Sequence, residues 1–181
     1  MAALTQTFLA ITLVASGTVR MSADSMWPNY PEGAIVKIEE LTRPIQRGDA
    51  IAFTRAEKDV IWVKRVVAIG GDTVKMSGAV PVINGVPLKR ERLPDRVHAY
   101  TGKAERVVLC FNERVDDNSY QVCELAGLHN KWDTTEMQRV PNGTYFVLGD
   151  NRDNSRDSRD SMMGFIEEMY VIGIVSEQEA G

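Results

Sequence analysis

The chain has 181 residues, enough for a single hydrophobic core or for one core with a modest insert. Hydrophobic residues make up 44% of it and charged residues 25%, a balance that argues against wholesale disorder. The formal net charge is −4 and the basic residues are scattered, so the chain offers no electrostatic footprint for nucleic acid. We therefore expect a globular protein with no nucleic-acid partner.

The first nineteen residues carry no charged side chain, and residues 8–15 are their most apolar part. As a helix, nineteen residues would extend about 28 Å, close to the roughly 30 Å hydrocarbon thickness of a membrane. Several Thr, Ser and Gly residues weaken this segment as a span, and it lacks the basic start of an export signal. The residues alone leave two interpretations open: a membrane anchor, or a helix that packs on the domain.

Short runs rich in β-branched and aromatic residues begin after Arg20 and are separated by turn sequences. Asn84-Gly85, between apolar neighbours, is a strong hairpin signal. No internal repeat is visible, and no long amphipathic helix follows the N-terminus. We expect a mostly β protein, with strands at residues 34–38, 50–53, 60–67, 80–83, 106–111, 145–148 and 170–175.

Residues 88–139 are more charged than the rest and alternate less cleanly between apolar and polar side chains. We interpret this region as an inserted subdomain that is joined to the main sheet at both ends. The predicted parts are an apolar N-terminal helix (1–19), a β core (20–80 and 140–176) and an insert (81–139).

The chain has two cysteines, Cys110 and Cys123, and two histidines, His98 and His129. No Cys-x-x-Cys motif and no Cys/His cluster is present, which argues against a structural zinc site. We expect no metal and no cofactor. The spacing of the cysteines leaves open a single disulfide or two buried thiols.

The most specific local feature is residues 149–159, Gly-Asp-Asn-Arg-Asp-Asn-Ser-Arg-Asp-Ser-Arg, directly after an apolar strand. A calcium loop is excluded, because Arg152 and Ser155 occupy positions where that loop needs an oxygen ligand and glycine. Short polar side chains of this kind bond to nearby backbone, and Asp and Arg can pair. The loop is therefore suited to holding other groups in place.

A serine and a lysine are the remaining candidates for chemistry. Ser25 precedes Met-Trp-Pro, and Lys64 continues the apolar run 60–63. If Lys64 points inward, desolvation would lower its pKa from about 10.4 toward neutrality, as a general base requires. Since both histidines lie in the predicted insert, a nucleophilic serine would need another base, and a buried lysine can serve.

Taken in order, four segments resemble the type I signal peptidase family. They are its serine box (25–28), its Arg-Gly-Asp strand (47–53), its lysine box (64–72) and its C-terminal box (149–159). The likeness extends from residue 25 to residue 164, where Met-Gly-Phe stands for the family's aromatic-Gly-Phe. It implies a signal-peptidase-like fold of antiparallel β-sheets, with a smaller inserted β subdomain and a short N-terminal helix.

The resemblance implies a serine endopeptidase that removes N-terminal signal peptides from exported preproteins. Ser25 would be the nucleophile and Lys64 the general base. Ser155 matches the serine that orients the lysine, and Asp157 and Arg159 match an acid and base pair that supports the region.

The resemblance also implies how substrate is selected. Met26, Trp62 and Val63 fall where the family lines shallow pockets for small residues at −1 and −3, and such pockets exclude bulk. The backbone N–H of Ser25 would supply one oxyanion donor. Ala23 stands where many bacterial members carry a second donor, a hydroxyl.

A membrane helix precedes the serine box in this family, so the resemblance favours an anchor for residues 1–19 and membrane lipid as a partner. It places the protein at the bacterial inner (cytoplasmic) membrane, with the catalytic domain on the extracytoplasmic side. That oxidising compartment favours a disulfide between Cys110 and Cys123.

Three other interpretations stay open. One is a specialised maturation peptidase of a conjugation or pilus system. A self-cleaving repressor-type Ser–Lys protease would need a helical DNA-binding domain upstream, and the residues before Ser25 contain none. A non-catalytic β scaffold with decayed motifs is disfavoured, because Ser25, Lys64 and Ser155 are all intact.

Overall fold

The computed structural model describes residues 13–14, 17–55, 60–99 and 104–176. Within these residues the regular structure is β-strand, apart from one turn of 3-10 helix, η1 (Glu168–Tyr170). The prediction of a mostly β protein is therefore confirmed.

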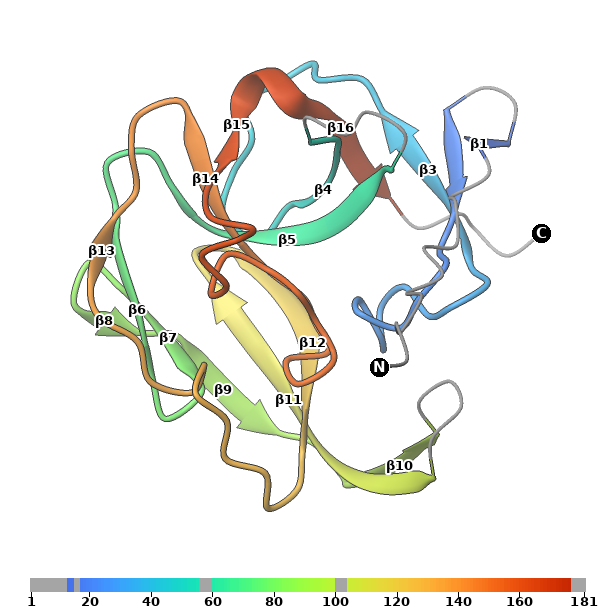
Figure 1. Cartoon of the computed structure of the whole chain (residues 1–181), viewed down its shortest axis with the longest axis vertical. Helices are drawn as coiled ribbons and strands as arrows, with labels where there is room; N and C mark the ends of the chain where they lie inside the picture. The colour runs from blue at the N-terminus through green and yellow to red at the C-terminus, as the bar shows by residue number, and fades with distance from the viewer. Residues whose placement is uncertain (1–12, 15–16, 56–59, 100–103, 177–181) are drawn as a thin grey trace, which may run out of the picture.

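A large sheet forms one half of the molecule, and all of its neighbouring strands pair antiparallel (Figure 1). Its spatial order is β1-β2-β3-β16-β4-β5-β14-β15. The strands are β1 (Leu13–Val14), β2 (Thr18–Arg20), β3 (Ile35–Glu39), β4 (Ala50–Phe53), β5 (Trp62–Ile69), β14 (Thr144–Leu148), β15 (Ile166–Glu167) and β16 (Val171–Ser176).

Two smaller sheets lie on one side of the large sheet (Figure 1). One joins β9 (Lys89–Arg92), β10 (Arg96–Ala99), β11 (Glu105–Val115) and β12 (Asn118–Leu125), all within the range predicted for the insert. The other joins β6 (Thr73–Ser77), β7 (Val80–Ile83), β8 (Val86–Pro87) and β13 (Gln138–Arg139). Because β6 pairs with β7, this third sheet crosses the predicted boundary at residues 80 and 81.

The Asn84-Gly85 turn joins β7 to β8 as predicted. Both residues have positive φ, 51° for Asn84 and 82° for Gly85. Two successive positive φ angles give a turn whose twist matches that of the flanking strands, which is why this dipeptide favours a hairpin.

The predicted N-terminal helix is wrong where the structure can be compared with it. Leu13–Val14 forms β1 and Thr18–Arg20 forms β2, and β2 pairs with β3. Gly17 turns the chain at φ 73°, and the β-branched Val19 is fully buried in the sheet's core. Residues 1–12 and 15–16 of that prediction lie outside the described residues. Among the described residues, no helix has the length and apolar character to cross a membrane.

The core is built on both faces of the large sheet. Along β4, Ala50 and Ala52 pack into one apolar cluster, whereas Ile51 and Phe53 pack into another, as the two-residue period of a strand requires. A third cluster joins β5 and β14 to β6 and β7, through side chains such as Phe146. The strands that carry the site are thus fixed from both sides.

Cys110 and Cys123 form a disulfide, which confirms that expectation. They lie opposite each other in the β11–β12 pair. The bridge and Val108 form a small buried cluster, and Trp27 packs against it. The insert sheet therefore has its own cross-link beside the segment that follows Ser25.

Candidate active site

Ser25 lies in the turn that connects β2 to β3. Met26 and Tyr30 form an isolated bridge within this turn, and the Tyr30 N–H donates to the Met26 carbonyl at 2.9 Å. Both side chains are buried in the core. The turn is therefore anchored on either side of Pro28, while Ser25 itself stays half-buried.

Lys64 lies in β5, between β4 and β14, and is only 2% exposed. Its Nζ is 2.7 Å from Ser25 Oγ, a hydrogen-bond distance that joins residues 39 positions apart. Nζ also donates to the Val63 carbonyl at 2.9 Å. The lysine therefore points inward at the serine, which is the condition for a lowered pKa.

Burial lowers the pKa of Lys64 to about 8, and the negative charges of Asp157 and Asp150 only partly oppose this effect. Each carboxylate has its own guanidinium, which offsets its field at the amine. Asp157 pairs with Arg159 at 2.8 Å, and Asp150 pairs with Arg65 at 2.6 Å. The neutral amine that a general base needs is thus accessible near neutral pH.

The Asp157–Arg159 pair closes the loop 149–159 on itself. Burial would raise the pKa of Asp157, but the adjacent Arg159 outweighs it and the net shift is downward. Asp157 also accepts from the Gly149 N–H at 3.0 Å, and Arg159 donates to the Arg152 carbonyl at 2.5 Å. The two predicted support residues are together, and they organise the loop rather than contact Ser25.

Ser155 does not make the predicted hydrogen bond to Lys64. Its Oγ is buried, and its interaction with Asp157 helps to lower the pKa of that carboxyl but falls short of standard hydrogen-bond geometry. It lies against Gly149, where an added Cβ would come within 2.2 Å of Ser155 Oγ and 2.6 Å of the Ser25 carbonyl oxygen. The loop reaches the serine this closely because residue 149 has no side chain.

The same loop is tied to the Ser25 turn and to the insert. The Asn151 N–H donates to the Ser25 carbonyl at 3.1 Å, and Asn151 Nδ2 donates to the Asp24 carbonyl at 3.0 Å. On the other side, the Cys123 N–H donates to the Asp150 carbonyl, and the Arg152 N–H donates to the Cys123 carbonyl. The loop therefore fixes the serine turn relative to β12.

The three residues predicted to bind substrate are not on one surface. Met26 and Val63 share a core cluster and are 0% and 4% exposed. Trp62 packs on another cluster and is half-buried, with its ring centroid 5.7 Å from Lys64 Nζ. The structure thus places Trp62 beside the amine and leaves little exposed surface on Met26 and Val63.

Sequence reasoning missed the buried ion pairs around this loop. Arg65 is bonded to Asp150 through two nitrogens, at 2.7 and 2.6 Å. Glu113 is fully buried and accepts from Arg152 and Arg90. Burial would raise the pKa of Glu113, but these two cations lower it to about 2. The sequence did carry one signal for such a pair. Arg65 directly follows Lys64 in a central strand, and a buried arginine needs a charged partner.

His98 was placed outside the site because it belongs to the predicted insert. The structure brings its Nε2 to 3.2 Å from Asp24 Oδ2, one residue before the serine. Ser25 Oγ is nevertheless in contact with the amine of Lys64, at 2.7 Å.

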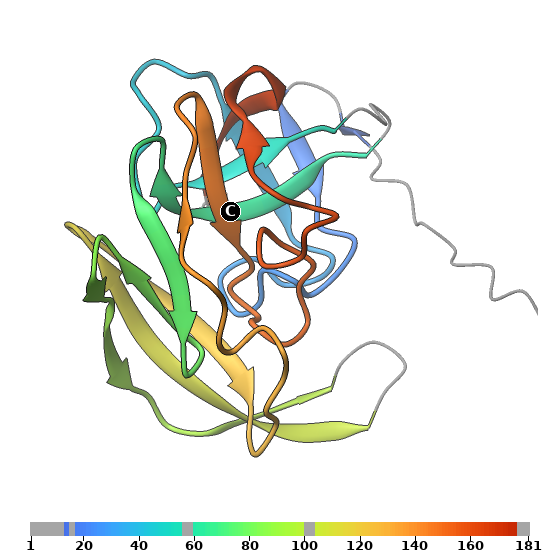
Figure 2. The ribbon, with the colours of Figure 1, turned by 60° about the vertical axis from the view of Figure 1, so that its left-hand side comes forward.

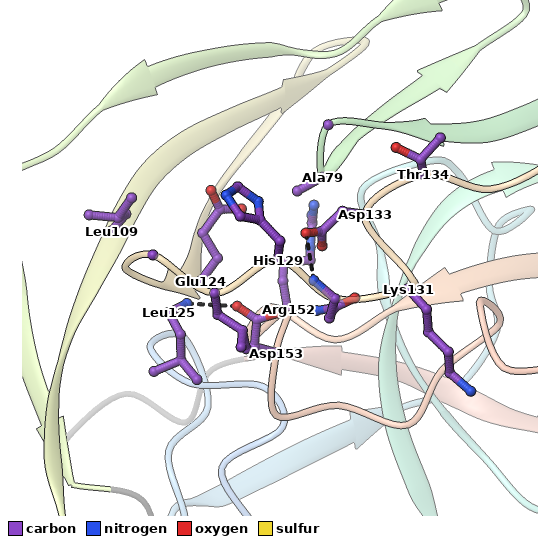
Figure 3. Close-up of a pocket in the computed structure, with 14 residues that line it drawn as sticks. Ala79, Leu109, Glu124, Leu125, His129, Lys131, Asp133, Thr134, Arg152 and Asp153 are labelled. Atoms are coloured by element: carbon purple, nitrogen blue, oxygen red, sulfur yellow. Dashed lines mark hydrogen bonds between the residues drawn. The ribbon is translucent and has the colours of Figure 1, made fainter.

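A separate cavity of about 500 Å³ lies between the open end of the β11–β12 hairpin (away from its turn), residues 127–134 and the loop residues Arg152 and Asp153 (Figure 3). Asp153, one of the lining residues, accepts from the Leu125 N–H at 2.7 Å and from Asn130 Nδ2. Neither Ser25 nor Lys64 lines this cavity. In the described part of the chain, no group of His, Cys, Asp and Glu side chains could hold a metal ion.

A serine hydroxyl within hydrogen-bond distance of a buried lysine is the arrangement of a serine peptidase that uses lysine in place of histidine. The chain belongs to the signal peptidase family, peptidase S26, whose sequence profile matches residues 1–178.

Individual relatives agree with this assignment. The chain is 34% identical over 131 residues to a signal peptidase I of Rickettsia bellii (strain OSU 85-389), covering 68% of this chain and 44% of the relative. It is 31% identical over 138 residues to a signal peptidase I of Rickettsia typhi, covering 72% and 50%. It thus spans about half the length of these relatives. A crystal structure of a signal peptidase I from Enterococcus faecalis V583 aligns with TM-score 0.44 and 26% identity, over 74% of this chain and 98% of that one.

Proposed function

We propose that the protein is a membrane-associated serine endopeptidase that removes N-terminal signal peptides from exported preproteins. The observation that carries this proposal is the 2.7 Å approach of Lys64 Nζ to Ser25 Oγ, with the amine buried and its pKa lowered to about 8. Membership of the signal peptidase family supports the substrate class.

In the proposed reaction, neutral Lys64 removes the proton of Ser25 as Oγ attacks the scissile carbonyl. The ammonium then gives that proton to the leaving amine, which departs as the N-terminus of the mature protein and leaves an acyl-enzyme. Neutral Lys64 next takes a proton from water, whose oxygen attacks the ester. Returning that proton to Ser25 Oγ releases the signal peptide and restores the starting state.

Ser155 is proposed to orient Lys64 during the second half of the reaction. Acylation converts Ser25 Oγ into an ester oxygen, which removes a partner of the lysine amine. The Ser155 hydroxyl is buried, lies beside the Ser25 backbone and interacts with Asp157 without a hydrogen bond of standard geometry. It can therefore take a new partner at little cost, because no well-formed hydrogen bond has to be broken.

The proposed substrates carry small residues at −1 and −3, and of the three residues predicted to bind them, Trp62 is the one with exposed surface to meet them. Membrane lipid is the other proposed partner, and the proposed location is the extracytoplasmic side of the bacterial inner membrane. The Cys110–Cys123 disulfide supports an oxidising compartment.

Cleavage of a preprotein tests the proposal. The protein in detergent is incubated with a preprotein whose signal peptide ends in Ala-x-Ala, and the new N-terminus is read by mass spectrometry. We expect cleavage after the last alanine, and a loss of at least about 10³-fold in rate for Ser25→Ala. Ser77→Ala, at an exposed serine, is the matched control and should keep the full rate. Cleavage that persists in Ser25→Ala contradicts the proposal.

The pH dependence should identify the base. Lys64 acts in its neutral form, so activity is lost as the pH falls through the lysine's pKa of about 8. At pH 7 only about a tenth of the enzyme would be competent, and the rate should rise about tenfold per pH unit below 8 and then level off. Single-turnover rates between pH 6 and 9.5 measure this profile. A midpoint near 6.5 would instead point to a histidine.

A further inference from the structure

A histidine of the insert contacts the serine turn. His98, in β10, contacts Asp24, which precedes Ser25, and Trp27, which lies two residues after it. Its Nε2 lies 3.2 Å from Asp24 Oδ2, and its ring stacks on Trp27 with centroids 4.1 Å apart and planes 24° apart. In Figure 2 the blue segment that carries the serine lies between the large sheet and the β10–β11 hairpin. Strand β10, which lies more than 70 residues further along the chain, therefore contacts the turn that carries the nucleophile.

The hydrogen bonds of Asp24 show how the His98 contact affects the position of Ser25. The residue is 8% exposed, and its Oδ1 accepts from the Glu32 N–H at 2.9 Å. Its backbone carbonyl accepts from Asn151 Nδ2 at 3.0 Å. A carboxylate oxygen accepts hydrogen bonds, so the ring of His98 donates to it through Nε2. The residue before Ser25 is thus held from the turn, the loop and the insert at once.

Trp27 is held from the insert as well. It packs against the cluster formed by Val108 and the disulfide. The guanidinium of Arg96 lies 5.9 Å from its ring centroid, and Arg96 is itself fixed by a 2.9 Å hydrogen bond to Gln121. Stacking on one face and this cation nearby restrict the ring, and with it the backbone two residues after the serine.

We infer that His98 is a positioning residue for Ser25. Its hydrogen bond to Asp24 and its stacking on Trp27 hold residues 24–27 so that Ser25 Oγ stays at reaction distance from Lys64 Nζ. This role rests on the proposed function of Ser25. It also makes the insert part of the catalytic apparatus, because β10 is held in place by its pairing with β11.

Cleavage kinetics test the positioning role. We expect His98→Ala to lower kcat by about 10- to 100-fold with KM within about twofold, because small misplacements of a reacting group have large effects on rate. The Nε2 of His98→Gln can occupy the place of the ring nitrogen and donate to Asp24, so this variant should return to within about threefold of the wild type. His129→Ala, at the other histidine, is the matched control. Each rate is divided by the concentration of Ser25 that can be acylated. A smaller folded fraction of a variant then does not lower its measured kcat.

Hydrogen exchange provides a readout that needs no substrate. Amides of residues 24–27 should exchange faster in His98→Ala, and at the wild-type rate in His98→Gln and His129→Ala. An unchanged kcat or unchanged exchange in His98→Ala overturns the positioning role. If the wild type cleaves no preprotein but His98→Ala still alters the exchange, the proposed function fails and the bracing of this turn by His98 stands.

Discussion

Replacing Lys64 by methionine is expected to lower the rate of preprotein cleavage by about 10³- to 10⁴-fold, the upper range for loss of a positioned general base. Methionine is apolar and flexible enough to fill the space of the lysine stem, and it adds no buried charge. Only the amine that lies 2.7 Å from Ser25 Oγ is removed. The variant should therefore fold and bind substrate while failing to activate the serine.

The control is Lys37→Met, because the Lys37 side chain is 60% exposed and makes only a surface ion pair. Single-turnover cleavage and thermal unfolding are measured for both variants. Lys64→Met that folds and keeps more than about a tenth of the wild-type rate would assign the base to another residue. Lys64→Arg should also be inactive, because a guanidinium does not give up its proton in this pH range.

The strands could be predicted wherever a short β-branched run stands between turn residues. The expected strands at 50–53 and 145–148 agree with β4 (Ala50–Phe53) and β14 (Thr144–Leu148) to within one residue. The N-terminal segment was harder, since a short apolar run fits a buried strand as well as a helix. Pairing of β2 with β3 decides between them at Thr18–Arg20, and the partner strand lies outside the local pattern.

The residues of the candidate site likewise fall into those that a local motif predicts and those that only long-range contacts bring together. Ser25 and Lys64 could be predicted because each stands in a local motif. The contact of His98 with Asp24 joins residues 74 positions apart, and the Arg65–Asp150 pair spans 85 positions. Such contacts depend on which strands lie side by side, and no short sequence pattern carries that information. The buried position of the Ser155 hydroxyl is likewise a property of the packed loop.

The buried charges explain how a lysine can be neutral next to acidic residues. Asp150 and Asp157 both raise the pKa of Lys64, and burial outweighs them. If either carboxylate lost its guanidinium, its field at the amine would be less well offset. Arg159 of the loop and Arg65 of β5 thus offset the two carboxylates nearest the Lys64 amine, in addition to holding the loop's shape.

Removing one member of the Arg65–Asp150 pair is expected to have the largest effect on stability. Their side chains are 7% and 1% exposed, and Asp150 also accepts from Asn29 at 2.7 Å. Asp150→Ala leaves the Arg65 guanidinium buried without its carboxylate, which should lower the free energy of unfolding by about 3–5 kcal/mol. The unpaired positive charge should also lower the pKa of Lys64, which moves the pH midpoint of cleavage below 8.

Urea unfolding of the wild type and three variants measures the effect on stability. Asp116→Ala is the matched control, because Asp116 is 58% exposed in its ion pair with Arg47 and should cost less than about 1 kcal/mol. The double variant Arg65→Met/Asp150→Leu should recover most of the loss, since it leaves no unpaired buried charge. A loss for Asp150→Ala no larger than that for Asp116→Ala would mean that water reaches Arg65. The pair would then contribute to the electrostatics of the site without holding the loop in place.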